Sequence, residues 1–279
     1  MTAAAVGVLP LAGCAALNPF ASHQPAKEAV VPEPQTPELL YNHGLDALNR
    51  SDYGTAVKEF DALEENYPYS SWATNSQIMQ GYSNYARRNY QEAVTVLDRY
   101  IQLHPVARDT AYAYYLRALC YYEQIGSIDR DQKDTLDAMK ALQEVVNRYP
   151  DTAYGRDARL KIALCRDHLA GAEMEVGRFY ESQHLYEAAI GRFQRVVDDF
   201  QTTNQVPEAL HRLTEIYLKL GMVDQARKTA AVLGYNYPGS SWYSDSYRDL
   251  VNSGQVKAVA ETAPAKQPGF FSRAFGWLF

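Results

Sequence analysis

The chain has 279 residues, of which 47% are hydrophobic and 22% are charged, a balance typical of globular proteins rather than disordered or fibrous ones. Its net charge of −6 and pI near 5.6 argue against a nucleic-acid partner, because binding nucleic acid requires concentrated Lys and Arg. The 22 Tyr, against 9 Phe, suit seams between helices, where a ring is buried while its hydroxyl reaches a partner. No apolar run approaches the ~20 residues of a membrane-spanning helix.

Residues 1–13 are small, apolar and uncharged, like the hydrophobic part of a secretory signal peptide. They run into Leu11-Ala12-Gly13-Cys14, which resembles the bacterial lipobox and predicts a lipid on Cys14. The usual basic segment is missing, so we expect the signal to be truncated or the start codon to lie upstream. Acylation of Cys14 is expected to anchor the chain without a transmembrane helix. Because Ala follows Cys14, lipoprotein sorting rules favour the outer membrane. Residues 14–37 contain five Pro and predict an extended tether.

A repeat is visible in the strings NYPYSSW at 66–72, RYPDTAY at 148–154 and NYPGSSW at 236–242. An Ala about twelve residues before the end of each unit is followed four residues later by a second apolar residue. These pairs are Ala56/Phe60, Ala93/Leu97, Ala138/Leu142, Ala189/Phe193 and Ala226/Ala230. The pattern resembles the tetratricopeptide repeat, a unit of ~34 residues with two helices. Small residues let the two helices approach closely, and Pro ends the second helix. The Ser that follows is expected to cap the next helix, at Ser70 or Ser71 and at Ser240 or Ser241.

The pattern therefore predicts an all-α fold, a tetratricopeptide-repeat superhelix over residues 38–251, with about five helix pairs and a C-terminal capping helix. The expected helices are 38–49 with 53–66, 71–88 with 90–103, 109–125 with 134–148, 154–183 with 186–200, 207–220 with 223–235, and 241–251. Two units are irregular. The third carries a polar insertion at 126–134, and the fourth begins with a helix of about thirty residues, so specific contacts are expected there.

Catalytic chemistry is not indicated by the sequence, which has no G-x-S-x-G, P-loop, H-E-x-x-H or Gly-rich dinucleotide loop. Cys165 and His168 share one predicted helix but lack further ligands at metal-binding spacing. Cys120 and Cys165 lie on the first helices of consecutive units. They are either buried thiols or a disulfide, which an oxidising compartment permits. We expect no enzyme activity, no cofactor and no metal.

Residues 252–279 are predicted to be a linker and an aromatic tail. In a helix Phe271, Phe275 and Leu278 share one face, whereas in an extended strand Phe271, Phe275, Trp277 and Phe279 lie on one side. The helical form fits a membrane surface or a groove, and the strand form resembles the C-terminal signal of outer-membrane β-barrels. These four aromatic residues are the predicted contact residues of the tail. A tail without a role is the open alternative.

The lipobox, the tether and the five degenerate repeats together resemble the BamD family, lipoproteins of the bacterial β-barrel assembly machinery. Further matching strings are LDRYIQLHP at 97–105, VNRYPDTAY at 146–154 and DHLA at 167–170. The resemblance covers about residues 38–251. It implies a lipid-anchored scaffold on the periplasmic face of the outer membrane, with BamA, other Bam subunits and unfolded outer-membrane β-barrel substrates as partners.

The resemblance also implies where partners bind. In the fourth unit the matching arginine is Arg192, expected to pair with a carboxylate of BamA, although an ordinary solvated side chain is the alternative. The aromatic residues of the first two units are candidates for a substrate groove, although most of them could equally pack the helix seams. They are Tyr41, Tyr67, Trp72, Tyr82 and Tyr85. A scaffold for cell-wall or division proteins is the competing function. A lytic transglycosylase is disfavoured because the repeats leave no room for a catalytic domain.

Overall fold

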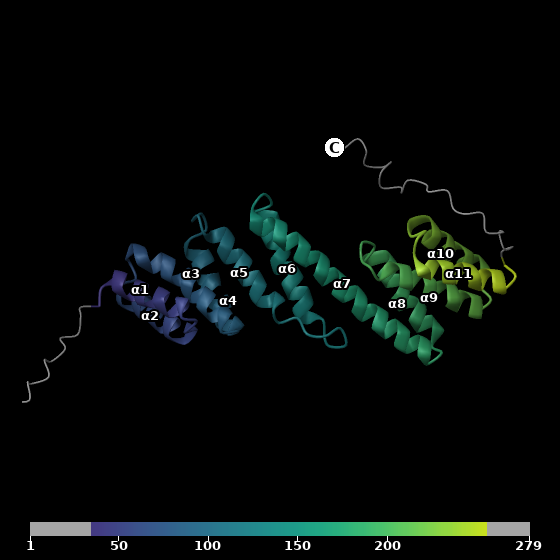
Figure 1. Ribbon diagram of the computed structural model, residues 1–279, viewed down its shortest axis with the longest axis horizontal. Helices are drawn as coiled ribbons and strands as arrows, with labels where there is room; N and C mark the ends of the chain where they lie inside the picture. Colours follow the sequence, from purple (N-terminus) through teal and green to yellow (C-terminus); the bar gives the residue numbers. More distant parts are fainter. Residues whose placement is uncertain (1–34, 256–279) are drawn as a thin grey trace, which may run out of the picture. The chain divides into compact units, whose positions relative to one another are not determined.

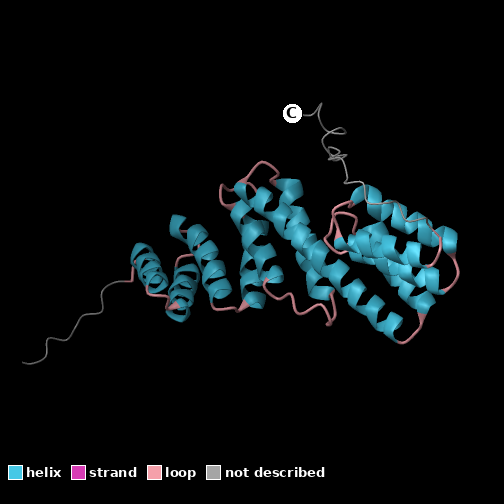
Figure 2. Ribbon diagram, turned by 45° about the vertical axis from the view of Figure 1, so that its right-hand side comes forward, coloured by secondary structure: helices cyan, strands magenta, loops and turns pink. Residues whose placement is uncertain are grey.

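In the computed structural model, which describes residues 35–255, the described chain consists of eleven helices joined by short loops and contains no strand (Figures 1 and 2). The prediction of an all-α tetratricopeptide-repeat array is confirmed, and every helix end lies within three residues of its predicted position. The bounds are α1 Pro37–Asn49, α2 Tyr53–Asn66, α3 Ser71–Ala86, α4 Tyr90–Leu103, α5 Thr110–Tyr122, α6 Lys133–Arg148, α7 Ala153–Ser182, α8 Tyr186–Asp199, α9 Val206–Lys219, α10 Val223–Asn236 and α11 Ser241–Asn252.

Several sequence predictions fall on residues outside the described range. These are the signal peptide at 1–13, the lipidated Cys14, most of the tether at 14–37, and the aromatic tail with Phe271, Phe275, Trp277 and Phe279. The division of the chain into signal, tether, array and tail therefore stays a prediction. Within the described residues, none of the helices combines the length and the apolar character that a bilayer span requires.

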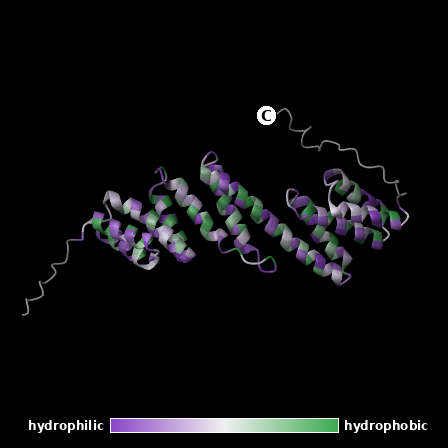
Figure 3. Ribbon diagram, in the orientation of Figure 1, coloured by the Kyte–Doolittle hydropathy of each residue, from purple (hydrophilic) through white to green (hydrophobic). Residues whose placement is uncertain are grey.

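Each helix packs against the next one in the chain, and the first helices of successive units also contact each other, α1 with α3, α3 with α5, and α5 with α7. Hydrophobic and hydrophilic residues are mixed around every helix, as Figure 3 shows. Most helices bury an apolar stripe against their neighbours, whereas α3 also buries several polar side chains, those of Ser76, Gln77, Gln80, Ser83 and Asn84. All ten residues of the predicted Ala-containing pairs are buried, at 0–4% exposure. This is why their spacing recurs in every unit.

Close approach within a pair depends on a residue that has no side chain. A Cβ atom on Gly44 would lie 2.5 Å from the Phe60 ring, and a Cβ on Gly177 would lie 2.5 Å from the Phe193 ring. Gly81 faces Leu97 in the same way, at 2.7 Å. The sequence indicated Gly44 and Gly81 as small positions but missed Gly177, because the length of α7 hides the register of the fourth unit.

Three of the loops between units use the same kind of cap at the start of the next helix. The side chains of Ser70, Thr152 and Ser240 each accept a hydrogen bond from the first turn of the helix that follows, at 3.0–3.2 Å. Such caps satisfy backbone N–H groups that have no partner within the helix. The predicted caps at Ser70 and Ser240 are confirmed.

The irregular third and fourth units share the long helix α7. One large cluster of buried residues takes Ala158 and Cys165 from its first half, and the second takes Ala170 and Met174 from its second half. Thirty residues at 1.5 Å per residue span ~45 Å. One continuous helix therefore belongs to both cores. The polar insertion is a loop over residues 123–132, and α6 begins at Lys133, slightly earlier than predicted.

Cys120 and Cys165 are free, buried thiols. Burial raises the pKa of Cys120 to about 12 and that of Cys165 to about 11. At neutral pH both side chains are therefore protonated, and they pack as small apolar groups in the core.

The glycine at the centre of the fourth pair provides a test of this packing. We expect Gly177→Ala to lower the free energy of unfolding by ~1–3 kcal/mol, because the added methyl group has to displace the buried Phe193 ring. Gly191→Ala, on α8, is the matched control: nothing lies within 4 Å of its Cβ position, so a gain of up to ~1 kcal/mol is expected from helix propensity. Urea unfolding followed by circular dichroism measures both. Equal stability of the two variants would contradict the packing argument.

Candidate partner-binding surfaces

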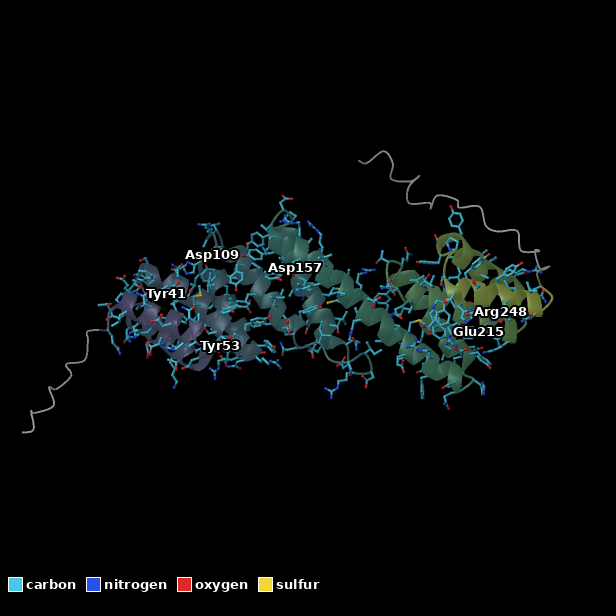
Figure 4. The ribbon with its side chains drawn as sticks, in the orientation of Figure 1. Tyr41, Tyr53, Asp109, Asp157, Glu215 and Arg248 are labelled. Carbon is cyan, nitrogen blue, oxygen red and sulfur yellow. The ribbon has the colours of Figure 1, made fainter. Side chains whose placement is uncertain are left out.

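The predicted substrate-groove residues form two separate groups. Tyr41, Tyr67 and Trp72 come together around Leu40, Leu63 and Ala73 at the seam of α1, α2 and α3. The Tyr41 ring lies 4.9 Å from Trp72 and 5.9 Å from Phe60, measured between ring centroids, and Figure 4 labels Tyr41 in this region. All three side chains are half-buried. They therefore stabilise the first unit and leave only part of each side chain accessible to a ligand.

Tyr82 and Tyr85 lie further along, on α3, where they join residues of α5 and α7. Tyr82 is 37% exposed. Tyr112, Tyr115 and Tyr154 complete this group, which we name the tyrosine face. The Tyr154 ring lies 5.7 Å from Tyr112 and 5.2 Å from Tyr115, at an interplanar angle of 30° to the latter. The rings of α5 and α7 thus lie side by side, and the Tyr85 hydroxyl reaches them from α3 by donating a 3.4 Å hydrogen bond to Glu123 at the end of α5.

Three hydroxyl groups of the tyrosine face, those of Tyr85, Tyr112 and Tyr115, have a raised pKa. Burial, and next the neighbouring Tyr82 and Tyr154, raise the pKa of Tyr112 to about 12. Burial and then Glu123 raise the pKa of Tyr85 to about 12. Burial, followed by the hydrogen bond that its hydroxyl donates to Asp157, also raises the pKa of Tyr115; that bond is 2.5 Å long. These three hydroxyls therefore stay protonated at neutral pH, and the face offers rings for stacking and hydroxyls for hydrogen bonds.

Sequence reasoning missed Tyr112, Tyr115 and Tyr154. A signal was present, since Tyr82 and Tyr85 are three residues apart on their helix and Tyr112 and Tyr115 repeat this spacing thirty residues later. Residues three apart share a helix face, so the repeat could have extended the predicted groove into the third unit.

Arg192 lies on α8 and is paired within the chain. Its Nη1 donates to the Glu173 carboxylate of α7 at 3.0 Å, and Arg195 Nη1 reaches the other oxygen of the same carboxylate, also at 3.0 Å. The Arg192 side chain is 38% exposed, whereas Glu173 is 16% exposed. A shallow cavity of about 360 Å³ next to it is lined by Tyr180, Glu187, Arg192 and Arg195.

This pairing bears on the alternative that Arg192 is an ordinary solvated side chain. The guanidinium is not a freely solvated group, because Glu173 holds it and raises its pKa further through a hydrogen bond. Held in this way, its remaining N–H groups point from a fixed position, which lowers the entropy lost when a second carboxylate binds. Whether a partner supplies that carboxylate stays a prediction.

Two hollows flank the insertion loop along α7. A cavity of about 560 Å³ lies between α5, the loop and α7, with Ile128 and Leu164 among its apolar residues. A second, of about 500 Å³, continues past the loop to Val176 and Phe179. Leu164 is 58% exposed and Phe179 is 60% exposed. The irregular units thus carry the exposed apolar side chains at which contacts were expected.

The chain is similar to known proteins over most of its length. A family model described as YfiO, outer membrane lipoprotein, matches residues 33–233. A curated relative from Caulobacter vibrioides, named outer membrane protein assembly factor BamD, is 45% identical over 89% of this chain and 79% of its own length. A relative of the same name from Rickettsia prowazekii is 44% identical over 76% of this chain and 85% of its own length. Another, from Neisseria meningitidis, is 33% identical over 80% of this chain and 87% of its own length. The chain therefore belongs to the YfiO family of outer membrane lipoproteins, which includes the BamD assembly factors.

Proposed function

We propose that this chain is a lipid-anchored scaffold of the outer-membrane β-barrel assembly machinery, which helps BamA fold and insert barrel proteins. The observation that carries the proposal is the 45% identity to a BamD assembly factor over 89% of the chain. An array of helix pairs supports a scaffold role, because its function resides in the surfaces it presents rather than in a reaction centre. Acylated Cys14 anchors the array, on the periplasmic face of the outer membrane.

Within this proposal the two ends of the array have different tasks. The tyrosine face and the Tyr41, Tyr67 and Trp72 cluster receive unfolded barrel substrates, whose exposed strands alternate apolar and polar side chains. Aromatic rings bind such segments with little sequence preference, and protonated hydroxyls satisfy backbone carbonyls. The fourth and fifth units, which include Arg192, bind the periplasmic domains of BamA through charge pairs.

Depletion of the protein tests the proposed function as a whole. Folded porins in the outer membrane should fall on depletion, and BamA should co-purify with the protein from detergent extracts. Normal porin levels after depletion would overturn the proposal. Recovery of peptidoglycan hydrolases without BamA would instead support the competing role of a scaffold for cell-wall or division proteins.

Charge reversal at Arg192 tests the contact with BamA. Arg192→Glu should weaken capture of the periplasmic domains of BamA by about tenfold, because a repelling carboxylate replaces a positioned donor. Arg195→Glu is the matched control, since Arg195 shares the same Glu173 and its loss disturbs that carboxylate equally. Capture is measured by biolayer interferometry after confirming equal thermal stability. An equal loss in both variants would assign the effect to Glu173 and refute a specific role for Arg192.

Substitution of Tyr82 tests the substrate surface. Tyr82→Ala should weaken binding of a fluorescent peptide from the last strand of a barrel protein by about fivefold, in line with loss of an aromatic anchor. Tyr69→Ala serves as the control, because Tyr69 is fully exposed on the loop before α3. Fluorescence anisotropy reports both affinities. If Tyr82→Ala binds as tightly as the native protein, the tyrosine face is not the substrate surface.

A further inference from the structure

At the C-terminal end of the described array, α9 and α11 bring three potential metal ligands together. The ligand atoms of His211, Glu215 and Asp249 all lie within 4.8 Å of one another. His211 and Glu215 are four residues apart on α9 and therefore share a face, while Asp249 comes from α11, which packs against α9. Figure 4 labels Glu215 in this region.

His211 is held in a fixed orientation. Its side chain is 7% exposed, its ring lies 5.2 Å from the Trp242 ring, and its Nδ1 is 2.8 Å from Ser246 Oγ. With Nδ1 on the serine, Nε2 is directed at Glu215 Oε2. The separation is 3.6 Å, which is too long for a hydrogen bond. Metal-binding histidines have this arrangement, because a hydrogen bond to one ring nitrogen orients the other toward the ion.

One oxygen of the Glu215 carboxylate is buried without a hydrogen-bond donor. Its Oε2 atom is buried and has no hydrogen-bond partner among residues 35–255. The nitrogen atoms near it are His211 Nε2 and Arg212 Nη1, each at 3.6 Å. Arg212 also contacts Glu181 and Glu208, so it keeps carboxylate partners if Glu215 turns to an ion. A buried oxygen without a donor costs free energy unless a cation or water satisfies it.

The two carboxylates of the cluster face an open cavity. Glu215 and Asp249 both line an open cavity of about 400 Å³, together with Asn252 at the end of α11. The cluster therefore combines a buried, oriented imidazole with carboxylates that open onto the surface.

We propose that His211, Glu215 and Asp249 form a binding site for one divalent metal ion of the Zn²⁺ class. One imidazole nitrogen and two carboxylate oxygens suit Zn²⁺ and neighbouring transition metals better than Ca²⁺ or Mg²⁺, which take oxygen ligands. The ion joins the capping helix α11 to the fifth helix pair. Because it binds only the folded arrangement, it stabilises this end of the array. The site is independent of the proposed assembly function.

Titration of the full chain with Zn²⁺, after removal of metals with EDTA, tests the site. Isothermal titration calorimetry should show one ion per chain. Asp249→Asn and Glu215→Gln should weaken binding at least tenfold, and Ser246→Ala, which frees the His211 ring, by about tenfold. Asp245→Asn is the matched control, one turn earlier on α11 and paired with Arg248 at 2.7 Å; it should bind like the native protein. His211→Gln is preferred to alanine because the position is buried.

Two further measurements separate this site from other metal binding. Zn²⁺ should raise the Tm and slow amide hydrogen exchange in α11 for the native chain and for Asp245→Asn, but not for Asp249→Asn. Absence of Zn²⁺ binding would overturn the proposal. Binding that Asp249→Asn and Glu215→Gln leave unchanged would overturn it as well, because the ion would then lie elsewhere in the chain.

Discussion

Each helix pair depends on how closely its two helices can approach at one point of contact. In the first, second and fourth pairs that point is a glycine on the first helix, which accepts Phe60, Leu97 or Phe193 from the second. A methyl group on the glycine has no space, since the side chain that packs against the glycine is completely buried in each of these pairs. Interiors at crystal-like density do not absorb such a group without moving a neighbour. The spacing of small and bulky residues that recurs from unit to unit is thus a direct consequence of close packing.

Packing of this kind is local, and that locality explains how the array tolerates irregular units. Each helix contacts its neighbours in the chain and the matching helix of the adjacent unit. An insertion at 123–132 or a first helix of thirty residues therefore changes one interface without disturbing the others. The same irregular segments leave Leu164 and Phe179 exposed along α7.

The described array carries both an aromatic surface and linked ion pairs. The first helices of the second to fourth units present the tyrosine face, in which burial raises the pKa of Tyr85 and Tyr112. Linked ion pairs occur along the array. Arg117 joins Asp98 and Glu144 in the second and third units. In the fourth and fifth units Glu173 holds Arg192 and Arg195, and Arg212 lies among Glu181, Glu208 and Glu215. An aromatic surface suits extended chains of varied sequence, and fixed charges suit a folded partner of defined shape.

The sequence by itself determined the fold class, the number of helix pairs, and the helix ends to within three residues, because Pro, Ser caps and the Ala-containing pairs act over one or two helical turns. It also selected Tyr82 and Arg192 as surface candidates. Only the tertiary structure decided that Tyr41 and Trp72 pack a seam, that Tyr82 continues into Tyr112 and Tyr154, and that Glu173 holds Arg192. It alone brought Asp249 to His211 and Glu215, which lie more than thirty residues away. Such contacts join separate helices, and their register is set by packing between units, which the local pattern of one unit does not encode.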